Sequence, residues 1–240
     1  GAAGSGCWWL KFGQPLAGTP NDIGRNGEKP SHPELLDWLA AGLPRRGWSL
    51  RSMHRLLLTS ATYRQVSRGE GECWAKRRAA DPGNRLYSRM NRRRLDGESL
   101  RDTLLTLSGR ATQRAGGPGV RPPLPREITS TLLKNQWPVS SDEEDHHRRS
   151  VYLFARRNLR YPLFELFDRP DGASSCARRK ESTTAPQSLI LLNSDFSLTM
   201  AKALAKRCQV GATPAGESIR RMYGLLFPRE PSREDRKSVV

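Results

Sequence analysis

The sequence predicts a mainly α, irregular helical domain with long loops and a minor β element. Apolar residues recur at three- and four-residue spacing in several separate segments, which is typical of amphipathic helices. Stretches rich in glycine and proline separate these segments and predict long loops. One short run, residues 150–154, combines β-branched and aromatic side chains and is the best candidate for a strand.

The first third of the chain contains two predicted helices. One begins near Pro33, a residue suited to a first helical turn, and ends near Gly42. The next follows Ser49, a favourable N-cap residue, and carries the clearest apolar stripe in the chain. Residues 13–34 and 67–84 collect glycine, proline and charge without periodicity, so we expect loops there.

The rest of the chain alternates between periodic and aperiodic segments. Further helices are predicted over residues 96–108, 163–167, 186–193, 196–208 and 218–227. The long aperiodic stretch 110–147 is typical of a functional loop, a surface excursion or a domain boundary. Any boundary within the chain is therefore expected in the loop 110–147.

The composition is strongly basic. There are 41 basic and 24 acidic residues, giving a net charge of +17, and most of the excess is arginine. Such a charge attracts polyanions, and arginine binds carboxylate, sulfate or phosphate in a forked, bidentate geometry. Codon bias in a GC-rich genome is the competing explanation for the arginine excess.

Several chemistries are not expected. No run approaches the roughly 20 apolar residues that a membrane-spanning helix needs. The four cysteines lie far apart without a Cys-x-x-Cys pair, so zinc, iron–sulfur and covalent haem sites are unsupported. No cofactor and no metal are therefore predicted, while disulfides stay open.

Clusters of arginine are the most distinctive chemical feature. They lie at residues 92–94, 148–149, 156–157 and 178–180. The predicted ligand-binding residues are Arg92, Arg94, Arg149, Arg157 and Arg178, which we expect helix packing to gather onto one anion-binding face. The alternative is a set of solvated or acid-paired arginines. Nucleic acid is not an expected partner, because no recognised binding motif accompanies the charge.

Weaker candidates exist for acid–base catalysis, namely His32, Glu98, Asp168 and Asp171. Each has a structural explanation: His32 precedes a helix that it or Ser31 would cap, Glu98 lies on a polar helix face, and the two aspartates flank a turn. The acidic run 142–147 ends in two histidines and would suit a hard cation, but a solvated loop is the simpler interpretation. Cys176, which precedes two arginines, is a weak candidate for a reactive thiol.

Several segments together resemble a known family. They cover residues 30–39, 47–50, 59–65, 84–86, 92–102, 149–152, 167–171, 175–176 and 187–193. In this order they are similar to the PSD-type domain of unknown function (DUF1553) at the C-terminus of large planctomycete proteins. The resemblance implies a single domain over residues 12–230, which we expect to be a fragment of a longer chain. The resemblance implies an exported, extracytoplasmic setting and covalently linked cytochrome-C-like modules, but no established catalytic residues. The haem motif of those modules is absent here.

Three functional hypotheses follow. The leading one is an accessory binding module of an exported protein that recognises an anionic polysaccharide through its arginine clusters. The second is an enzyme acting on polysaccharide with an acid–base carboxylate pair. The third is a structural interaction domain with dispersed arginines. Convergence of the arginines or of the acids in one concavity would discriminate between them.

Overall fold

The computed structural model describes residues 2–19, 22, 25–130, 132, 136–176, 178–209, 214–227 and 229–237. It is mainly helical with long irregular connections, as the sequence predicts. The chain divides into two compact units. Unit 1 comprises Gly1–Arg94 and Cys176–Arg178, and unit 2 comprises Leu95–Ser175 and Arg179–Val240. The division falls at Arg94, and residues 110–147 lie inside unit 2.

Unit 1 contains four helices among its described residues: α1 (Ala2–Phe12), α2 (Pro33–Arg45), α3 (Leu50–Leu58) and α4 (Glu72–Ala80). Its core is aromatic. The Trp8 and Phe12 rings stack with centroids 3.9 Å apart, and Tyr87 meets Trp8 edge-on at 5.1 Å. Leu39 and Met53, from α2 and α3, close this core. Helices α2 and α3 therefore pack against one buried face of α1.

The predicted second helix of unit 1 is confirmed together with its cap. The Ser49 hydroxyl accepts a hydrogen bond from the Ser52 amide at 3.2 Å, as expected for an N-cap serine. His32 occupies the N-cap position of α2, but its side chain makes no capping hydrogen bond. Pro33 at the first helical position fixes that start instead.

Two helices of unit 1 were not predicted. α1 begins among small residues, and only Trp8 and Phe12 reveal its buried face. α4 lies within 67–84, where we expected a loop, and buries no residue at all. Its alanine, lysine, arginine and glutamate side chains favour helix without an apolar stripe, so periodicity does not detect it. The loop prediction for residues 72–80 was wrong for this reason.

Unit 2 contains the remaining helices of the described chain. They are α5 (Gly97–Leu107), α6 (Arg126–Thr129), the short 3-10 helices η1 (Glu143–His147) and η2 (Ser150–Tyr152), then α7 (Pro162–Leu166), α8 (Ala185–Asn193), α9 (Asp195–Cys208), α10 (Ala215–Leu226) and α11 (Arg233–Lys237). α5 packs against α7, α9 and η2. The core is completed by Phe164, Phe167 and Val120. The five helices predicted in this half are all present.

The strand predicted at 150–154 was wrong. Residues Ser150–Tyr152 form a 3-10 turn, because the amide of Ser150 donates to the Asp102 carboxylate and that of Tyr152 donates to the Arg149 carbonyl. Only Leu153 pairs in β fashion, through an isolated bridge to Val120. The minor β element consists of three such bridges in the described chain, since β propensity needs a continuous partner strand.

No helix in the described ranges combines the length and the apolar character needed to cross a membrane.

Candidate anion-binding sites

A hollow of about 340 Å³ lies in unit 1 between α4 and the segments on either side of it. Its walls include Arg68, Trp74, Arg78, Arg89, Asn91 and Arg92, and we call it the Trp74 hollow. Trp74 and Arg78 lie four residues apart on α4, so they share one helix face. The four arginines come from before, within and after the helix, and no carboxylate is among the described lining residues.

The wall that follows α4 is rigidly built around Asn84. Asn84 is buried, and its backbone has a positive φ of 51°. Its side-chain amide donates to the Arg89 carbonyl at 2.7 Å and to Asn91 Oδ1 at 2.9 Å. Asn91 in turn donates to the Phe12 carbonyl at 2.8 Å, which ties the wall to α1. The amide of Met90 donates to the Val66 carbonyl and joins the two segments beneath α4. The hollow is thus held open by internal hydrogen bonds.

The arginines of this hollow are in two different states. Arg89 forms internal hydrogen bonds: its guanidinium donates to the carbonyls of Asp81 at 3.0 Å and Pro82 at 2.7 Å. Across the part of the chain that the structure describes, no hydrogen bond or ion pair engages the guanidinium groups of Arg68, Arg78 and Arg92. Three forked donors therefore face solvent around one half-buried indole.

A second hollow of about 450 Å³ continues past Trp74. It shares Trp74 and Arg78 with the first and is otherwise lined by Gly69, Glu70, Gly71, Ala75 and Ala79, so this second hollow, unlike the first, includes a carboxylate. The indole is held against the preceding loop, since a Cβ added to Gly69 would stand 2.8 Å from the Trp74 Cε3 atom. The exposed surface around α4 is therefore an extended depression with an aromatic ring near its middle.

Unit 2 carries a smaller hollow of about 210 Å³ between the segment 154–161 and the turn that follows α7. Its walls include Phe154, Arg156, Arg157, Arg160, Tyr161, Arg169 and Asp171, and we call it the Arg157 hollow. An isolated antiparallel bridge between Arg156 and Leu159 shapes the first wall. This hollow brings together a predicted arginine and a predicted aspartate.

The five arginines predicted to bind a ligand are distributed as follows. Arg92 lines the Trp74 hollow and Arg157 lines the Arg157 hollow. Arg94 is half-buried in unit 1. Arg149 is exposed and lies 3.6 Å from Asp102 of α5. Arg178 is exposed, and its carbonyl accepts the Cys176 thiol at 3.3 Å.

The acid–base candidates are occupied by internal partners. Both oxygens of Glu98 accept from Arg179, at 2.9 and 3.1 Å, and Arg169 lies 3.4 Å away. Asp168 accepts from the amide and the hydroxyl of Ser182, at 2.8 and 2.9 Å. These interactions leave the two carboxylates in structural roles.

The other two candidates, Asp171 and His32, also have internal hydrogen-bond partners. The amide of Ala173 donates to Asp171 at 2.9 Å and, as the largest cause, lowers the pKa of Asp171. His32 belongs to unit 1, where its Nδ1 lies 3.0 Å from the Ser31 hydroxyl. Asp171 is the one candidate that lines either of the two named hollows.

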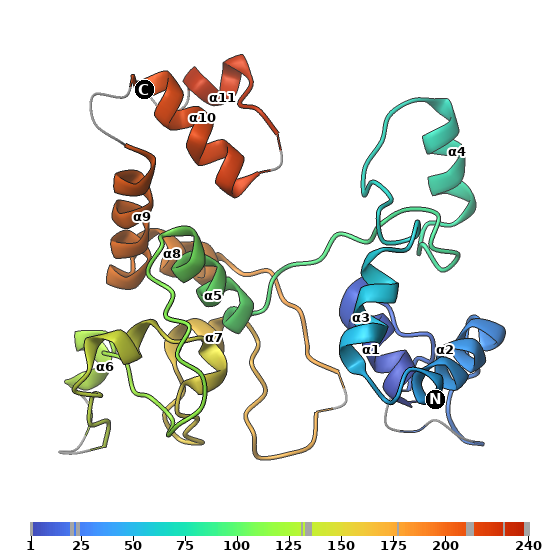
Figure 1. Cartoon of the computed structure of the whole chain (residues 1–240), viewed down its shortest axis with the longest axis horizontal. Helices are drawn as coiled ribbons and strands as arrows, with labels where there is room; N and C mark the ends of the chain where they lie inside the picture. The colour runs from blue at the N-terminus through green and yellow to red at the C-terminus, as the bar shows by residue number, and fades with distance from the viewer. Residues whose placement is uncertain are drawn as a thin grey trace. The chain divides into compact units, whose positions relative to one another are not determined.

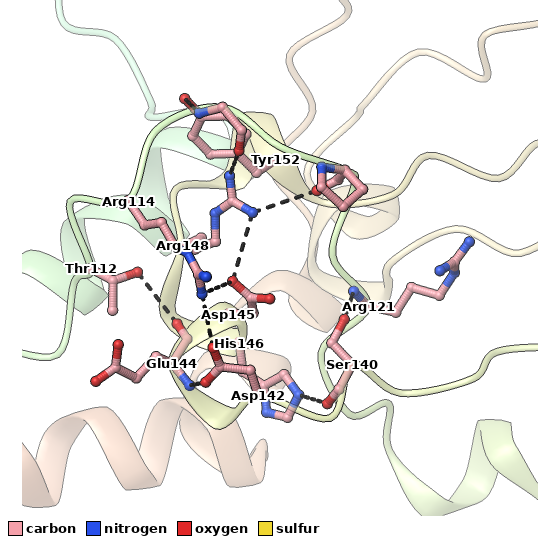
Figure 2. A network of polar contacts seen from close by, with 12 residues as sticks. Thr112, Arg114, Arg121, Ser140, Asp142, Glu144, Asp145, His146, Arg148 and Tyr152 are labelled. Atoms are coloured by element: carbon pink, nitrogen blue, oxygen red, sulfur yellow. Dashed lines mark hydrogen bonds and ion pairs between the residues drawn. The ribbon is translucent and has the colours of Figure 1, made fainter.

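The acidic run 142–147 is used for internal pairing (Figure 2). Asp142 and Asp145 both accept from Arg114, at 2.8 and 3.3 Å, and the Asp142 carboxylate also caps η1 through the Glu144 amide. His146 Nε2 lies 2.8 Å from the Ser140 carbonyl. In the described residues no group of three or more metal-ligating side chains is arranged around a common point. All four cysteine thiols are free.

Two fully buried arginines, Arg101 and Arg148, organise unit 2. Sequence analysis placed Arg148 in an arginine cluster expected on an anion-binding face, and it did not single out Arg101. Arg101 of α5 donates to the carbonyls of Arg148 at 2.8 Å and His146 at 2.6 Å, and burial lowers the pKa of Arg101. Arg148 donates to the Gly116 carbonyl and stacks 4.2 Å from the Tyr152 ring (Figure 2). The signal available in the sequence for Arg101 was its position among leucine residues on a predicted helix.

The wall residues Arg68, Trp74 and Arg78 were likewise missed, because they lie in a segment expected to be a loop. The i, i+4 spacing of Trp74 and Arg78 was the signal that a helix assignment would have exposed. Only Arg92, at the edge of an arginine cluster, was identified from this hollow.

Comparison with known proteins gives one match. No curated protein and no solved structure matches the chain. A single family model, PSD1, described as a protein of unknown function (DUF1553), matches residues 6–240 and confirms the resemblance inferred from the sequence. Because the match spans nearly the whole chain, the protein belongs to the PSD1 family of proteins of unknown function.

Proposed function

We propose that this protein is a binding module that recognises an anionic polysaccharide along the Trp74 hollow and its continuation in unit 1. The observation that carries the proposal is the set of three guanidinium groups, those of Arg68, Arg78 and Arg92, that surround Trp74 without a partner in the described chain. A guanidinium group binds carboxylate or sulfate in a forked, bidentate geometry, so three unpaired guanidinium groups around one hollow favour an external anion.

The shape of the site favours a chain-like ligand over a single ion. The two hollows around α4 are contiguous through Trp74 and Arg78 and have volumes of about 340 and 450 Å³. These volumes fall in the range of sites for organic ligands. An indole presents an apolar face to a sugar ring, while the arginines reach carboxylate or sulfate substituents on either side.

The competing functions receive less support. The carboxylates of Glu98 and Asp168 are occupied by Arg179 and Ser182, so neither is poised for proton transfer to a substrate. Many arginines of unit 2 do pair with acids, for example Arg114 and Arg169, which suits a structural role there. That description does not fit Arg68, Arg78 and Arg92. An extracytoplasmic setting with linked modules belongs to the same proposal, because acidic polysaccharides are polymers of the cell envelope.

The test is binding of the full chain to polygalacturonate, dextran sulfate and neutral dextran by isothermal titration calorimetry. We expect binding to the two charged polymers, weakening as salt shortens the Debye length below about 10 Å, and none to dextran. Arg78→Ala and Trp74→Ala should each weaken binding about three- to tenfold, equivalent to about 0.7–1.4 kcal/mol.

Arg77→Ala is the matched control. Arg77 lies on the same helix, is exposed, and does not line either hollow, so it removes the same charge from a neighbouring position. Binding by this variant should stay within a factor of two of the unaltered chain. Equal losses for Arg77→Ala and Arg78→Ala would show diffuse attraction to a basic surface, and the proposal would fail.

A further inference from the structure

The Arg157 hollow in unit 2 differs from the Trp74 hollow in size and in its neighbours. Its volume of about 210 Å³ is below the about 300 Å³ at which sites for drug-sized molecules begin. Two turns form it, the one around residues 156–159 and the one at 169–172. A ligand that fits this space is small.

Positive charge in this hollow is only partly balanced. Arg169 lies 3.4 Å from Glu98, and Arg160 lies 3.9 Å from Glu165. Arg156 has no carboxylate partner among the residues that the structure describes, and it donates to the Gln136 carbonyl and to Asn158 Oδ1. Arg157 is exposed, and within the described segments nothing engages its guanidinium. The uncompensated charge is therefore concentrated at two consecutive residues, Arg156 and Arg157.

The walls of the hollow are fixed before any ligand arrives. The bonds of Arg156 to Gln136 and Asn158 hold that guanidinium in place. Arg121 lies with its Cζ atom 4.0 Å from the centre of the Phe154 ring, and so adds a further positive charge beside the wall. A preorganised set of donors loses little conformational entropy on binding.

Asp171 opposes an anion on one side of the hollow. Its carboxylate accepts the Ala173 amide at 2.9 Å and lies within the electrostatic influence of Arg160. It stays ionised near neutral pH, so it repels an anion from its own edge of the hollow. The remaining favourable place is next to Arg156 and Arg157.

We propose that the Arg157 hollow binds one small tetrahedral oxyanion, sulfate or phosphate, free or as the end group of a monoester. The Arg157 guanidinium, which nothing engages in the described segments, donates to the anion in a forked geometry. Arg156 and Arg160 add positive charge around it. The site lies in unit 2 and is separate from the polysaccharide site proposed for unit 1.

The experiment titrates the 15N-labelled full chain with sodium phosphate, sodium sulfate and methyl phosphate at constant ionic strength, with chloride as the reference. Amide resonances of residues 154–161 and 169–172 should shift with a dissociation constant on the order of 1 mM. The three anions distinguish a free ion from a monoester. Absence of a saturable shift in these segments would overturn the proposal.

Variants separate the hollow from general charge effects. Arg157→Ala should weaken binding at least fivefold, while Arg149→Ala, an equal loss of charge on an exposed residue outside the hollow, should change it less than twofold. Asp171→Asn keeps an acceptor for the Ala173 amide, removes the repulsion, and should strengthen binding at least twofold. Equal weakening by Arg157→Ala and Arg149→Ala, or weakening by Asp171→Asn, would contradict the assignment.

Arg78→Ala tests the two proposals independently. It removes a wall of the Trp74 hollow and should leave the oxyanion shifts of unit 2 unchanged. If the polysaccharide proposal fails, the oxyanion titration still stands on its own result. If the oxyanion titration fails, the calorimetric test of unit 1 is unaffected.

Discussion

The exposed arginines around the Trp74 hollow of unit 1 and the two buried arginines of unit 2 are used in opposite ways. In unit 1, Arg68, Arg78 and Arg92 lie around a hollow with no protein partner in the described chain. In unit 2, Arg101 and Arg148 are buried and donate to backbone carbonyls of irregular segments. The difference arises from the neighbours: carbonyls that no helix or strand satisfies lie beside the buried arginines, whereas α4 presents its arginines to solvent. Arginine content alone therefore does not indicate a binding surface.

The cores of the two units differ in the same sense. Unit 1 is closed by stacked aromatic rings, with Trp8 and Phe12 at its centre. Unit 2 has a small apolar cluster around Phe164, and the Arg101 guanidinium lies beside it at 5.9 Å from the Tyr161 ring. Burial of apolar surface dominates the first unit, and satisfaction of buried polar groups is as important in the second.

The largest expected effect is on the aromatic core of unit 1. Phe12→Ala removes a ring that is 1% exposed and should lower the free energy of unfolding of unit 1 by about 3–5 kcal/mol. Hydrogen exchange measured by mass spectrometry should then accelerate in α2 and α3 and stay unchanged in α5 and α9. Leu10→Ala, at a 59% exposed position of the same helix, is the control. Equal acceleration in both units would show that the cores are not separate.

The second effect tests the buried guanidinium of unit 2. Arg101→Met keeps much of the side-chain volume but leaves the carbonyls of His146 and Arg148 without their donor. We expect a loss of about 2–4 kcal/mol, because each unsatisfied buried group costs about 1–3 kcal/mol. Urea denaturation measures the loss, and exchange should accelerate over residues 143–153. Arg110→Met, at an exposed position, should change stability by less than about 0.5 kcal/mol; a similar loss there would contradict the role of Arg101.

The helices of both units show how much of the fold the sequence predicts. Apolar periodicity predicted the helices around Met53, Leu105 and Met200 correctly. It did not predict every buried position, since the buried face of α5 also includes Gly97 and Arg101. α4 was missed because nothing on it is buried. The strand at 150–154 was wrong because the Asp102 carboxylate and a 3-10 turn take the amides that a strand would use.

The candidate sites were less accessible to sequence reasoning. Arg92 and Arg157 were selected from clusters, and the structure places them in different hollows of different units. Arg68 and Arg78 stand outside the chosen clusters, and the turn at Asn84 brings the segment with Arg92 into the same hollow. Whether a guanidinium group has a partner depends on which carbonyls and carboxylates lie near it in the folded chain. That proximity is set by tertiary structure and cannot be read from the sequence.

The third effect links the core of unit 1 to its hollow. Asn84→Ala places an alanine at a φ of 51° and removes the bonds to Arg89 and Asn91. We expect a loss of about 2–3 kcal/mol, combining left-handed strain with lost hydrogen bonds. Because Arg89 and Asn91 form one wall of the Trp74 hollow, binding to polygalacturonate should weaken as well. Asn84→Gly relieves the strain and should lose less stability; an equal loss would show that the backbone conformation is unimportant.

The smallest effect concerns the exposed acidic run of unit 2. The Glu144 amide, and then Arg114, lower the pKa of Asp142. A carboxyl group whose pKa is lower in the folded state stabilises the fold above its unfolded pKa, and that contribution disappears as the pH falls through the folded value. Asp142→Asn keeps the acceptor for the Glu144 amide and removes only the charge facing Arg114.

The urea midpoint of Asp142→Asn should therefore lie slightly below that of the unaltered chain near pH 7. The difference should vanish in acid, once the pH falls below the lowered pKa of Asp142, and should shrink in 1 M salt. Glu127→Gln removes a charge from the exposed helix α6 and should give no such pH-dependent difference. A difference for Asp142→Asn that persists in acid would mean that the side chain acts through its shape. In that case the acidic run would resemble the carbonyl-bound arginines of unit 2, where geometry rather than charge fixes the loop.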